Sequence, residues 1–276
     1  MSFKAGLIQL RSSREMETNL VEASKLIRQA ASQGATFIST PEMTNIFEPD
    51  RERLKAVVMT EAEDSSVLGF VELAAKLKIW LHLGSLALKG ADGKLVNRTL
   101  LLNPKGEIVA RYDKIHLFDV DLPNGDKSRE SETFTAGSEA VKVALPFCQL
   151  GLSICYDVRH PALYHALAKA GAEVLVVPAA FTVPTGKAHW HVLLRARAIE
   201  TGSYVIAAAQ GGTHDSGRET WGHSKVVDPW GKVIAEAGVD PEYLLFEINP
   251  AESVAARARI PALINVREFT LSEVKV

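Results

Sequence analysis

The sequence predicts an α/β domain whose β-sheets contain both parallel and antiparallel strands. Two parts of the chain, at about residues 5–88 and 150–209, alternate short apolar runs with segments in which apolar residues recur every third or fourth position. The runs predict buried strands and the segments predict amphipathic helices, as in parallel strand–helix units. Two other parts, at about residues 96–112 and 224–248, hold strand pairs around turns rich in proline and glycine, which predict antiparallel hairpins. We therefore expect a layered sandwich with mixed sheets.

The individual elements follow from this periodicity and from the residues that interrupt it. Gly34 supplies a residue type that ends many helices, and the first predicted helix before it has one apolar face, formed by Leu20, Ala23, Leu26, Ile27 and Ala30. In the first half we predict strands at 5–10, 36–39 and 79–88, helices at 19–32 and 67–77, and hairpin strands at 96–103 and 107–112. In the second half we predict strands at 141–145, 150–155, 174–177, 203–209, 224–228, 232–235 and 243–248, and helices at 162–170 and 188–201.

Residues 113–135 form a long segment without periodicity that is dense in charged side chains. A loop of this length inside a compact domain is usually functional or disordered. Because no linker or repeat interrupts the chain, we predict a single domain over residues 1–276. From about residue 251 we expect a C-terminal tail that packs on a neighbouring subunit.

Composition and charge exclude several classes of protein. The chain is 47% hydrophobic and 23% charged with a formal net charge of −2, so it offers no basic surface for nucleic acid or anionic membrane. It has no apolar run of the ~18 residues that a membrane span needs, and it begins without a secretory leader pattern. The two cysteines, Cys148 and Cys155, are too few for a disulfide framework. We therefore expect a cytoplasmic protein with reduced thiols.

Cys155 lies where a predicted strand meets a predicted helix. In open α/β sheets, active sites form beyond the carboxyl ends of the strands. The N-terminus of the following helix would favour the thiolate, which is the form that attacks an electrophile. A cysteine is also one of the residue types most often buried as a small hydrophobe. Its partners elsewhere in the chain have to decide between these two interpretations.

Two other ionisable residues follow predicted strands. Glu42 comes after Pro41, and Lys114 lies in the stretch 112–118. A carboxylate, an ammonium group and a thiol at one sheet edge would supply a base, a clamp for an oxyanion and a nucleophile, which together suffice for acyl transfer. Burial would have to raise the pKa of Glu42 toward neutrality for it to act well as a base. Taken singly, Glu42 could be a helix N-terminal acid and Lys114 a surface lysine.

Together these stretches resemble the nitrilase superfamily of carbon–nitrogen hydrolases. The resemblance rests on Pro41-Glu42, Lys114-Ile-His-Leu-Phe-Asp, Cys155-Tyr-Asp-Val-Arg-His-Pro, Leu194-Arg-Ala-Arg-Ala-Ile-Glu-Thr and Gly222-His-Ser-Lys-Val-Val-Asp-Pro-Trp-Gly. It implies a Glu-Lys-Cys triad with Glu42 as general base, Lys114 as oxyanion stabiliser and proton donor, and Cys155 as nucleophile. A fourth site residue would be Glu130, with Glu132 as the alternative register. The implied fold is a four-layer α-β-β-α sandwich that pairs into a homodimer or higher homo-oligomer.

The resemblance also implies a reaction, hydrolysis of a non-peptide amide bond without a cofactor. Cys155-Tyr156-Asp157 stands where true nitrilases have Cys-Trp-Glu, so the chain looks more like the Nit branch of amidases. The substrate would be a small amide, such as an α-keto acid amide or deaminated glutathione, and the nitrogen would leave as ammonia. An ω-amidase or an N-carbamoyl amidohydrolase is the alternative. The residues expected to contact substrate are Tyr156, Arg159, Phe181 and Thr185, and the candidates to hold a substrate carboxylate are Arg159, Lys187, Arg195 and Arg197.

Other functions are weighed against this one. His189 and His191 stand two apart on a predicted helix and face different directions, so we expect no metal site. His116 and His223 are expected to be structural or to line the pocket. A catalytically idle member that binds a metabolite or a partner protein is one alternative. A redox sensor that uses Cys148 and Cys155 is another.

Overall fold

The computed structural model describes residues 1–121, 125 and 127–274, and these contain two six-stranded sheets. In each sheet three parallel strands form the centre and antiparallel strands flank them, so the prediction of mixed sheets is confirmed. The first sheet has the order β16 (Glu242–Ile248), β1 (Phe3–Gln9), β2 (Phe37–Ser39), β3 (Trp80–Lys89), β4 (Leu95–Leu102) and β5 (Ile108–Asp113). The second has the order β15 (Val233–Glu236), β14 (Lys225–Val227), β11 (Tyr204–Ala207), β10 (Val174–Val176), β9 (Gln149–Gly151) and β8 (Lys142–Ala144).

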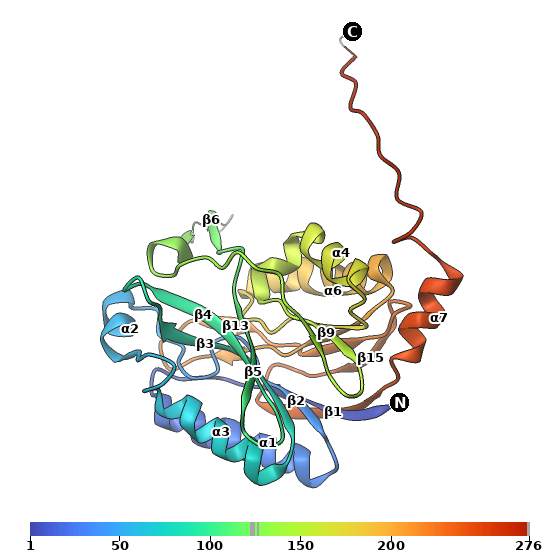
Figure 1. Cartoon of the computed structure of the whole chain (residues 1–276). Helices are drawn as coiled ribbons and strands as arrows, with labels where there is room; N and C mark the ends of the chain where they lie inside the picture. Colours follow the sequence, from blue (N-terminus) through green and yellow to red (C-terminus); the bar gives the residue numbers. More distant parts are fainter. Residues whose placement is uncertain (122–124, 126, 275–276) are drawn as a thin grey trace.

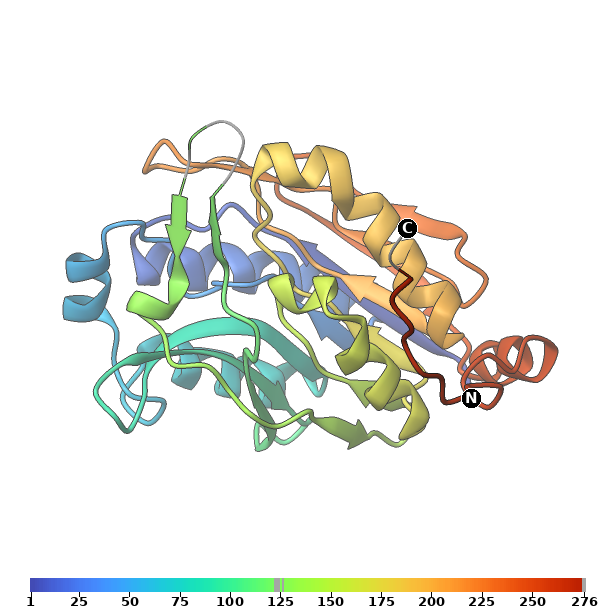
Figure 2. The same ribbon diagram turned by 90° about the horizontal axis from the view of Figure 1, so that it is seen from above.

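Helices cover the outer faces of both sheets. Helices α1 (Met16–Ser32) and α3 (Ser65–Leu77) lie on the first sheet, and α4 (Pro161–Lys169) and α6 (His191–Thr201) lie on the second (Figure 1). The view from above shows the second pair of helices running across its sheet (Figure 2). The four-layer α-β-β-α sandwich is thus confirmed.

Side chains on the central strands are buried on both faces, as expected for strands between two layers. On β1, Ala5 and Leu7 belong to the core between the sheets, whereas Ile8 belongs to the core under α1 and α3. Residues two apart on a strand face the same side, so this alternation lets one strand serve two apolar layers. The predicted apolar face of α1 is confirmed, because Ala23, Ile27 and Ala30 are fully buried.

The structure also corrects the predicted elements. The segment 113–135 is not one irregular loop, since it contains β6 (Asp119–Asp121), β7 (Lys127–Arg129) and the 3-10 turn η1 (Glu130–Glu132). Residues 122–124 and 126 of that segment lie outside the described residues. The strand predicted at 150–155 ends at Gly151, and the helix predicted at 188–201 is preceded by α5 (Val183–Thr185) and the π-helical turn η3 (Gly186–Trp190).

Four further elements lacked a signal strong enough to predict. They are α2 (Arg51–Val57), β12 (Gly211–Thr213), β13 (Glu219–Trp221) and α7 (Ala251–Arg259). Each is short, and α7 lies where only a tail was predicted. Beyond α7 the chain is extended and lies apart from the sandwich (Figure 1). Within the described ranges, no helix has both the length and the apolar character that a bilayer crossing requires.

Gly84 on β3 allows the two sheets to meet closely beside the site described below. A Cβ added at Gly84 would lie 1.9 Å from the backbone oxygen of Thr40 and 2.4 Å from Cβ of Pro178. Thr40 follows β2 and precedes Pro41 and Glu42, and Pro178 follows β10 in the second sheet. The absence of a side chain at Gly84 is therefore what lets the ends of β2 and β10 approach one another.

We predict that Gly84→Ala lowers the free energy of unfolding by about 3 kcal/mol, because neither the Thr40 backbone nor the Pro178 ring can move away freely. Urea denaturation measures this change. Gly238→Ala is the matched control, since the nearest atom to its added Cβ is 3.9 Å away, and it should change stability by less than about 0.5 kcal/mol. Equal stability of the two variants would contradict the close approach.

Candidate active site

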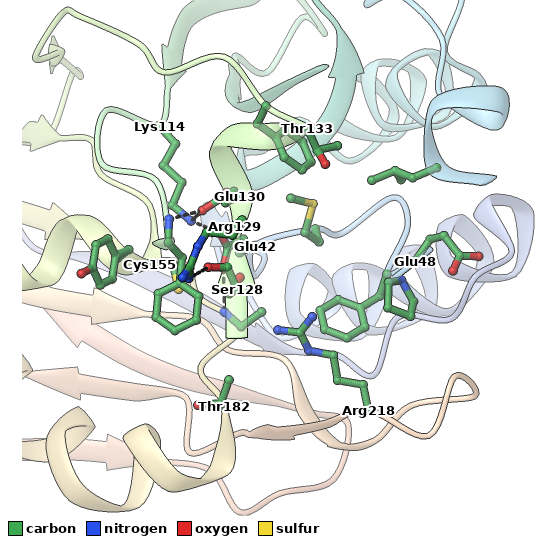
Figure 3. Close-up of a pocket in the computed structure, with 18 of the residues that line it drawn as sticks. Glu42, Glu48, Lys114, Ser128, Arg129, Glu130, Thr133, Cys155, Thr182 and Arg218 are labelled. Carbon is green, nitrogen blue, oxygen red and sulfur yellow. Dashed lines mark hydrogen bonds and ion pairs between the residues drawn. The ribbon is translucent and has the colours of Figure 1, made fainter. Parts of the chain in front are cut away.

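Glu42, Lys114, Glu130 and Cys155 come together at one cavity of about 250 Å³ (Figure 3). They arrive from separate parts of the chain: the loop after β2, the segment after β5, the 3-10 turn η1, and the start of a second 3-10 turn, η2 (Cys155–Arg159). The sequence left open whether Glu130 or Glu132 is the fourth site residue. In the structure Glu130 contacts Lys114. Glu132 instead forms an ion pair with Arg51.

Lys114 is the cation between two carboxylates. Its Nζ lies 2.8 Å from Oε1 of Glu42 and 2.9 Å from Oε2 of Glu130. The Lys114 side chain is 2% exposed, so each charge in this group has lost its hydration and depends on the others for compensation. Burial alone would lower the pKa of Lys114, but the two carboxylates outweigh it and raise the pKa well above its usual value. Lys114 is therefore an ammonium group throughout the physiological range.

Glu42 is held by donors on both carboxylate oxygens. Oε1 accepts from Lys114 and from Nδ2 of Asn97 (2.9 Å), and Oε2 accepts from the backbone N–H of Ala180 (2.9 Å). Burial raises the pKa of Glu42, but the charge and hydrogen bond of Lys114 outweigh it, and the pKa lies below its usual value of 4.5. The expectation that burial would raise this pKa toward neutrality is therefore wrong.

Cys155 lies at a sharp turn rather than directly at the end of a strand. Its backbone has φ +47°, a left-handed conformation that is uncommon outside glycine, and its N–H donates to the backbone oxygen of Pro178 (2.8 Å). Burial, together with the charge of Glu42, raises the pKa of the Cys155 thiol well above 9.0. Glu42 and Cys155 are thus close enough for each to affect the pKa of the other. The expectation of a thiolate stabilised by a helix N-terminus is wrong for this resting arrangement, because the desolvation of the sulfur and the neighbouring carboxylate dominate.

Asp157 joins the cysteine turn to the segment that carries Lys114. Its carboxylate, fully buried, accepts from the backbone N–H of Ile154 (2.8 Å), the hydroxyl of Tyr112 (2.6 Å), and the backbone N–H (3.0 Å) and Nδ1–H (2.6 Å) of His116. His116 is thus structural, one of the two roles expected for it. Arg159, two residues further on, does not share in this network, and its guanidinium lies 3.2 Å from Nδ1 of His189.

A family model described as carbon-nitrogen hydrolase matches residues 4–258 of the chain. The chain belongs to this family. It is 41% identical to a deaminated glutathione amidase of Synechocystis over 95% of this chain and 97% of that protein. It is 36% identical to human omega-amidase NIT2 over 94% of this chain and 93% of that protein. The NitFhit protein of C. elegans superposes with a TM-score of 0.91 at 37% identity, covering 96% of this chain and 65% of that one. The chain is therefore an amidase of the nitrilase superfamily.

In this hydrolase the predicted contact residues divide into two groups. Tyr156, Phe181 and Thr185 line the cavity. Arg159 is not among the lining residues, but its guanidinium carbon lies 5.8 Å from the Tyr156 ring centre and 5.5 Å from that of Phe181.

The other cations proposed from the sequence also lie outside the lining. Arg195 donates to the backbone oxygen of Gly231 (2.8 Å), and Arg197 donates to that of Val158 (2.9 Å) and pairs with Glu200. Lys187 is exposed. None of the three is among the residues that line the cavity.

Asn97 and Arg218 are site residues that sequence reasoning missed. Asn97 on β4 donates from one amide nitrogen to both Glu42 (2.9 Å) and Glu130 (3.2 Å), so it links the two carboxylates. A lone amide inside an apolar strand was the available signal. Arg218 lines the cavity from the loop between β12 and β13, two strands too short to be predicted.

Cys148, His191 and His223 do not line the cavity. Cys148 is a free, buried thiol, and burial raises its pKa to about 12, so it is a poor redox partner for Cys155. His191 contacts Lys225 and lies 3.4 Å from Glu236, which also meets His223. In residues 1–121, 125 and 127–274, no group of three or more His, Cys, Asp or Glu side chains is arranged to hold a metal ion.

The pKa directions predict a broad pH plateau for amide hydrolysis. Glu42 stays ionised as the pH falls because its pKa lies below 4.5, and Cys155 keeps its proton as the pH rises because its pKa lies above 9.0. A reaction that starts from this carboxylate and this thiol should give a kcat/KM that is flat from about pH 5.5 to pH 8.5. A pH–rate profile measures this. An acid limb centred above pH 6 that disappears in Glu42→Gln would contradict the assigned ionisation.

Proposed function

We propose that the protein hydrolyses the amide bond of a small acid amide, such as an α-keto acid amide or deaminated glutathione, through a thioester on Cys155. The observation that carries this proposal is the thiol of Cys155 beside the buried group of Glu42, Lys114 and Glu130 in one cavity. The similarity to a deaminated glutathione amidase along nearly the whole chain supports the substrate class.

In the acylation step the sulfur of Cys155 attacks the amide carbon while Glu42 accepts the thiol proton. The negative charge that develops on the carbonyl oxygen is stabilised by Lys114 and by the backbone N–H of Tyr156, because the N–H of Cys155 is already bonded to Pro178. A proton is delivered from Lys114 or the protonated Glu42 to the nitrogen, the C–N bond breaks, and a thioester remains.

In the deacylation step Glu42 accepts a proton from water as the water oxygen attacks the thioester carbon. The C–S bond breaks, the sulfur regains a proton and the acid is released. A primary amide loses its nitrogen as ammonia, the product expected from the sequence. A secondary amide such as deaminated glutathione loses it as an amine. Glu130 accepts from Lys114 and from the backbone N–H of Phe118 (2.6 Å), and we assign it the role of holding Lys114 and the adjoining loop in place.

An ω-amidase is the second candidate, favoured by the similarity to human omega-amidase NIT2. The two candidates share the chemistry at Cys155 and differ in the group that leaves. Comparing ammonia release from ω-amides and carbamoyl compounds with amine release from deaminated glutathione distinguishes them. A chain that binds these compounds without turnover would be the catalytically idle member.

We predict that Cys155→Ala abolishes turnover and that Glu42→Gln lowers kcat by at least about 10²-fold, because the first removes the nucleophile and the second removes the base. A quenched reaction of the wild-type protein should show an acyl adduct on Cys155 by intact mass. Cys148→Ala is the matched control and should retain activity and the adduct. Full activity of Cys155→Ala would refute the thioester mechanism.

We further propose that the protein acts as a homodimer, in a reducing compartment such as the cytoplasm that suits its two free thiols. Val192 and Ile199 on α6 are 68% and 55% exposed, and Trp230, which precedes the Gly231 that approaches Ile199, is 58% exposed. Along the extended tail, Phe269 and Leu271 are 90% and 94% exposed. A second copy would cover these apolar side chains, which are costly to leave in water.

We predict that the wild-type protein has about twice the mass of the 30.0 kDa chain by light scattering. Val192→Glu with Ile199→Glu should shift it toward 30.0 kDa, because charges would be buried in the interface. Val21→Glu is the control, since Val21 is 58% exposed on α1 in the opposite outer layer. A wild-type monomer at micromolar concentration would contradict the proposal.

A further inference from the structure

We infer that Gln210 is a positioning residue for the amide hydrolysis, because its side chain holds the backbone of Glu42 in the place that the base requires. Gln210 lies directly before β12 and is not among the residues that line the cavity. The inference rests on the proposed role of Glu42 as base, and it adds a residue that acts only through Glu42.

The side-chain amide of Gln210 is fully buried and uses both of its ends. Its Nε2 donates to the backbone oxygens of Glu42 (3.0 Å) and Met43 (3.3 Å) and to Oγ of Ser12 (2.8 Å). Its Oε1 accepts from the backbone N–H of Ser12 (2.9 Å). The Ser12 hydroxyl donates its own proton to the backbone oxygen of Thr44 (3.3 Å), so it accepts from the amide nitrogen. The two contacts with Ser12 therefore fix which end of the amide faces Glu42.

The turn that carries Glu42 needs such a partner because its backbone is sharply bent. Met43, the next residue, has φ +57°, a left-handed conformation that is uncommon outside glycine. Its N–H donates to Oγ of Ser85 (3.1 Å), while the oxygens of Glu42 and Met43 accept from Gln210. A buried carbonyl that loses its donor is costly, so removal of the amide would favour another conformation of this turn.

The backbone of Gln210 fixes the other side of the Glu42 carboxylate. Its N–H donates to the backbone oxygen of Ala179 (2.9 Å). The next residue, Ala180, donates from its own N–H to Oε2 of Glu42 (2.9 Å). Gln210 thus binds the main chain of Glu42 through its side chain, and it binds the segment of Ala180 through its backbone. It thereby sets the distance between the base and one of the donors that hold it.

A shift of the Glu42 backbone would change the charge state of the base. Burial raises the pKa of Glu42, but the charge and hydrogen bond of Lys114, 2.8 Å away, outweigh it and keep the pKa below 4.5. If the carboxylate moves away from Lys114, burial acts with less opposition and the pKa rises. The base is then lost by protonation at a higher pH, so the acid limb of kcat/KM moves upward. A residue that only stabilises the fold would not move this limb.

The test compares Gln210→Met with Gln9→Met, since methionine nearly keeps the shape of glutamine and cannot donate. Gln9 is the matched control because it is also fully buried and holds a different loop. Its amide donates to the backbone oxygens of Gly238 and Asp240 (both 2.8 Å) and accepts from the N–H of Ser224 (2.8 Å).

Gln210→Met should lower kcat about 10- to 100-fold and leave KM within about 3-fold. It should also move the acid limb of kcat/KM above about pH 5.5. Gln9→Met should lose a comparable amount of stability in urea and keep the wild-type kcat and pH profile. A folded Gln210→Met protein with the wild-type kcat and acid limb would overturn the inference, and so would an equal shift of the limb in both variants.

Ser12→Ala is a milder change that tests the same contact if Gln210→Met does not fold. It removes one of the groups that orient the amide and leaves the Gln210 side chain in place. We expect kcat to fall about 3- to 10-fold, with the acid limb shifted in the same direction. A wild-type profile in Ser12→Ala, together with an unfolded Gln210→Met protein, would assign Gln210 to the fold alone.

Alkylation of Cys155 by iodoacetamide, followed by intact mass, separates this inference from the proposed function because it needs no hydrolysis. Glu42→Gln sets the change in rate that loss of the base produces. Gln210→Met should change the rate in the same direction, and Gln9→Met should not change it. This pattern in a protein that hydrolyses none of the proposed amides would refute the proposed function and keep the role of Gln210. Normal turnover with equal alkylation of Gln210→Met and wild type would overturn the role of Gln210 alone.

Discussion

The buried group of two carboxylates and one ammonium is the constraint on which the site depends. None of these charges is stable alone in a closed space, because desolvation of an unpaired ion costs several kcal/mol. Lys114 compensates Glu42 and Glu130 together, and the remaining oxygen positions accept from Asn97 and from backbone N–H groups. Removing the ammonium would leave two carboxylates facing each other without compensation. The same arrangement that the chemistry needs is thus the one that holds the loops together.

The sandwich supplies the geometry for this group. Glu42 follows a central strand of the first sheet, and the backbone of Ala180, which binds it, follows a central strand of the second. The contact therefore spans the two sheets, and the missing side chain at Gly84 allows it. Asp157 adds a second link, since it holds the cysteine turn and the segment of Lys114 at once. Rigid elements thus set the distances between residues that are far apart in sequence.

Much of this could be predicted from the sequence. Strands and helices with a regular apolar period were found within a few residues of their ends, because burial in layers imposes that period. Glu42, Lys114 and Cys155 could be named because each sits in a motif. The direction of the pKa shift of Glu42 could not be predicted from the sequence. Burial raises this pKa and Lys114 lowers it, and which effect is larger depends on the distance between the two side chains. Arg218 was missed because it lies in a hairpin whose strands have only three residues each. Arg159 was named instead because it belongs to the motif that begins at Cys155.

The proton that Cys155 retains at rest gives the hydrolase chemical selectivity. Oxidants and alkylating agents react with thiolates, so a sulfur that stays protonated between substrates is spared damage that an exposed, acidic cysteine would suffer. When a substrate carbonyl oxygen lies beside Lys114, attack on its carbon becomes favourable and the thiol proton passes to Glu42. The substrate thereby promotes formation of the thiolate that attacks it. The thiolate therefore forms together with substrate binding rather than before it.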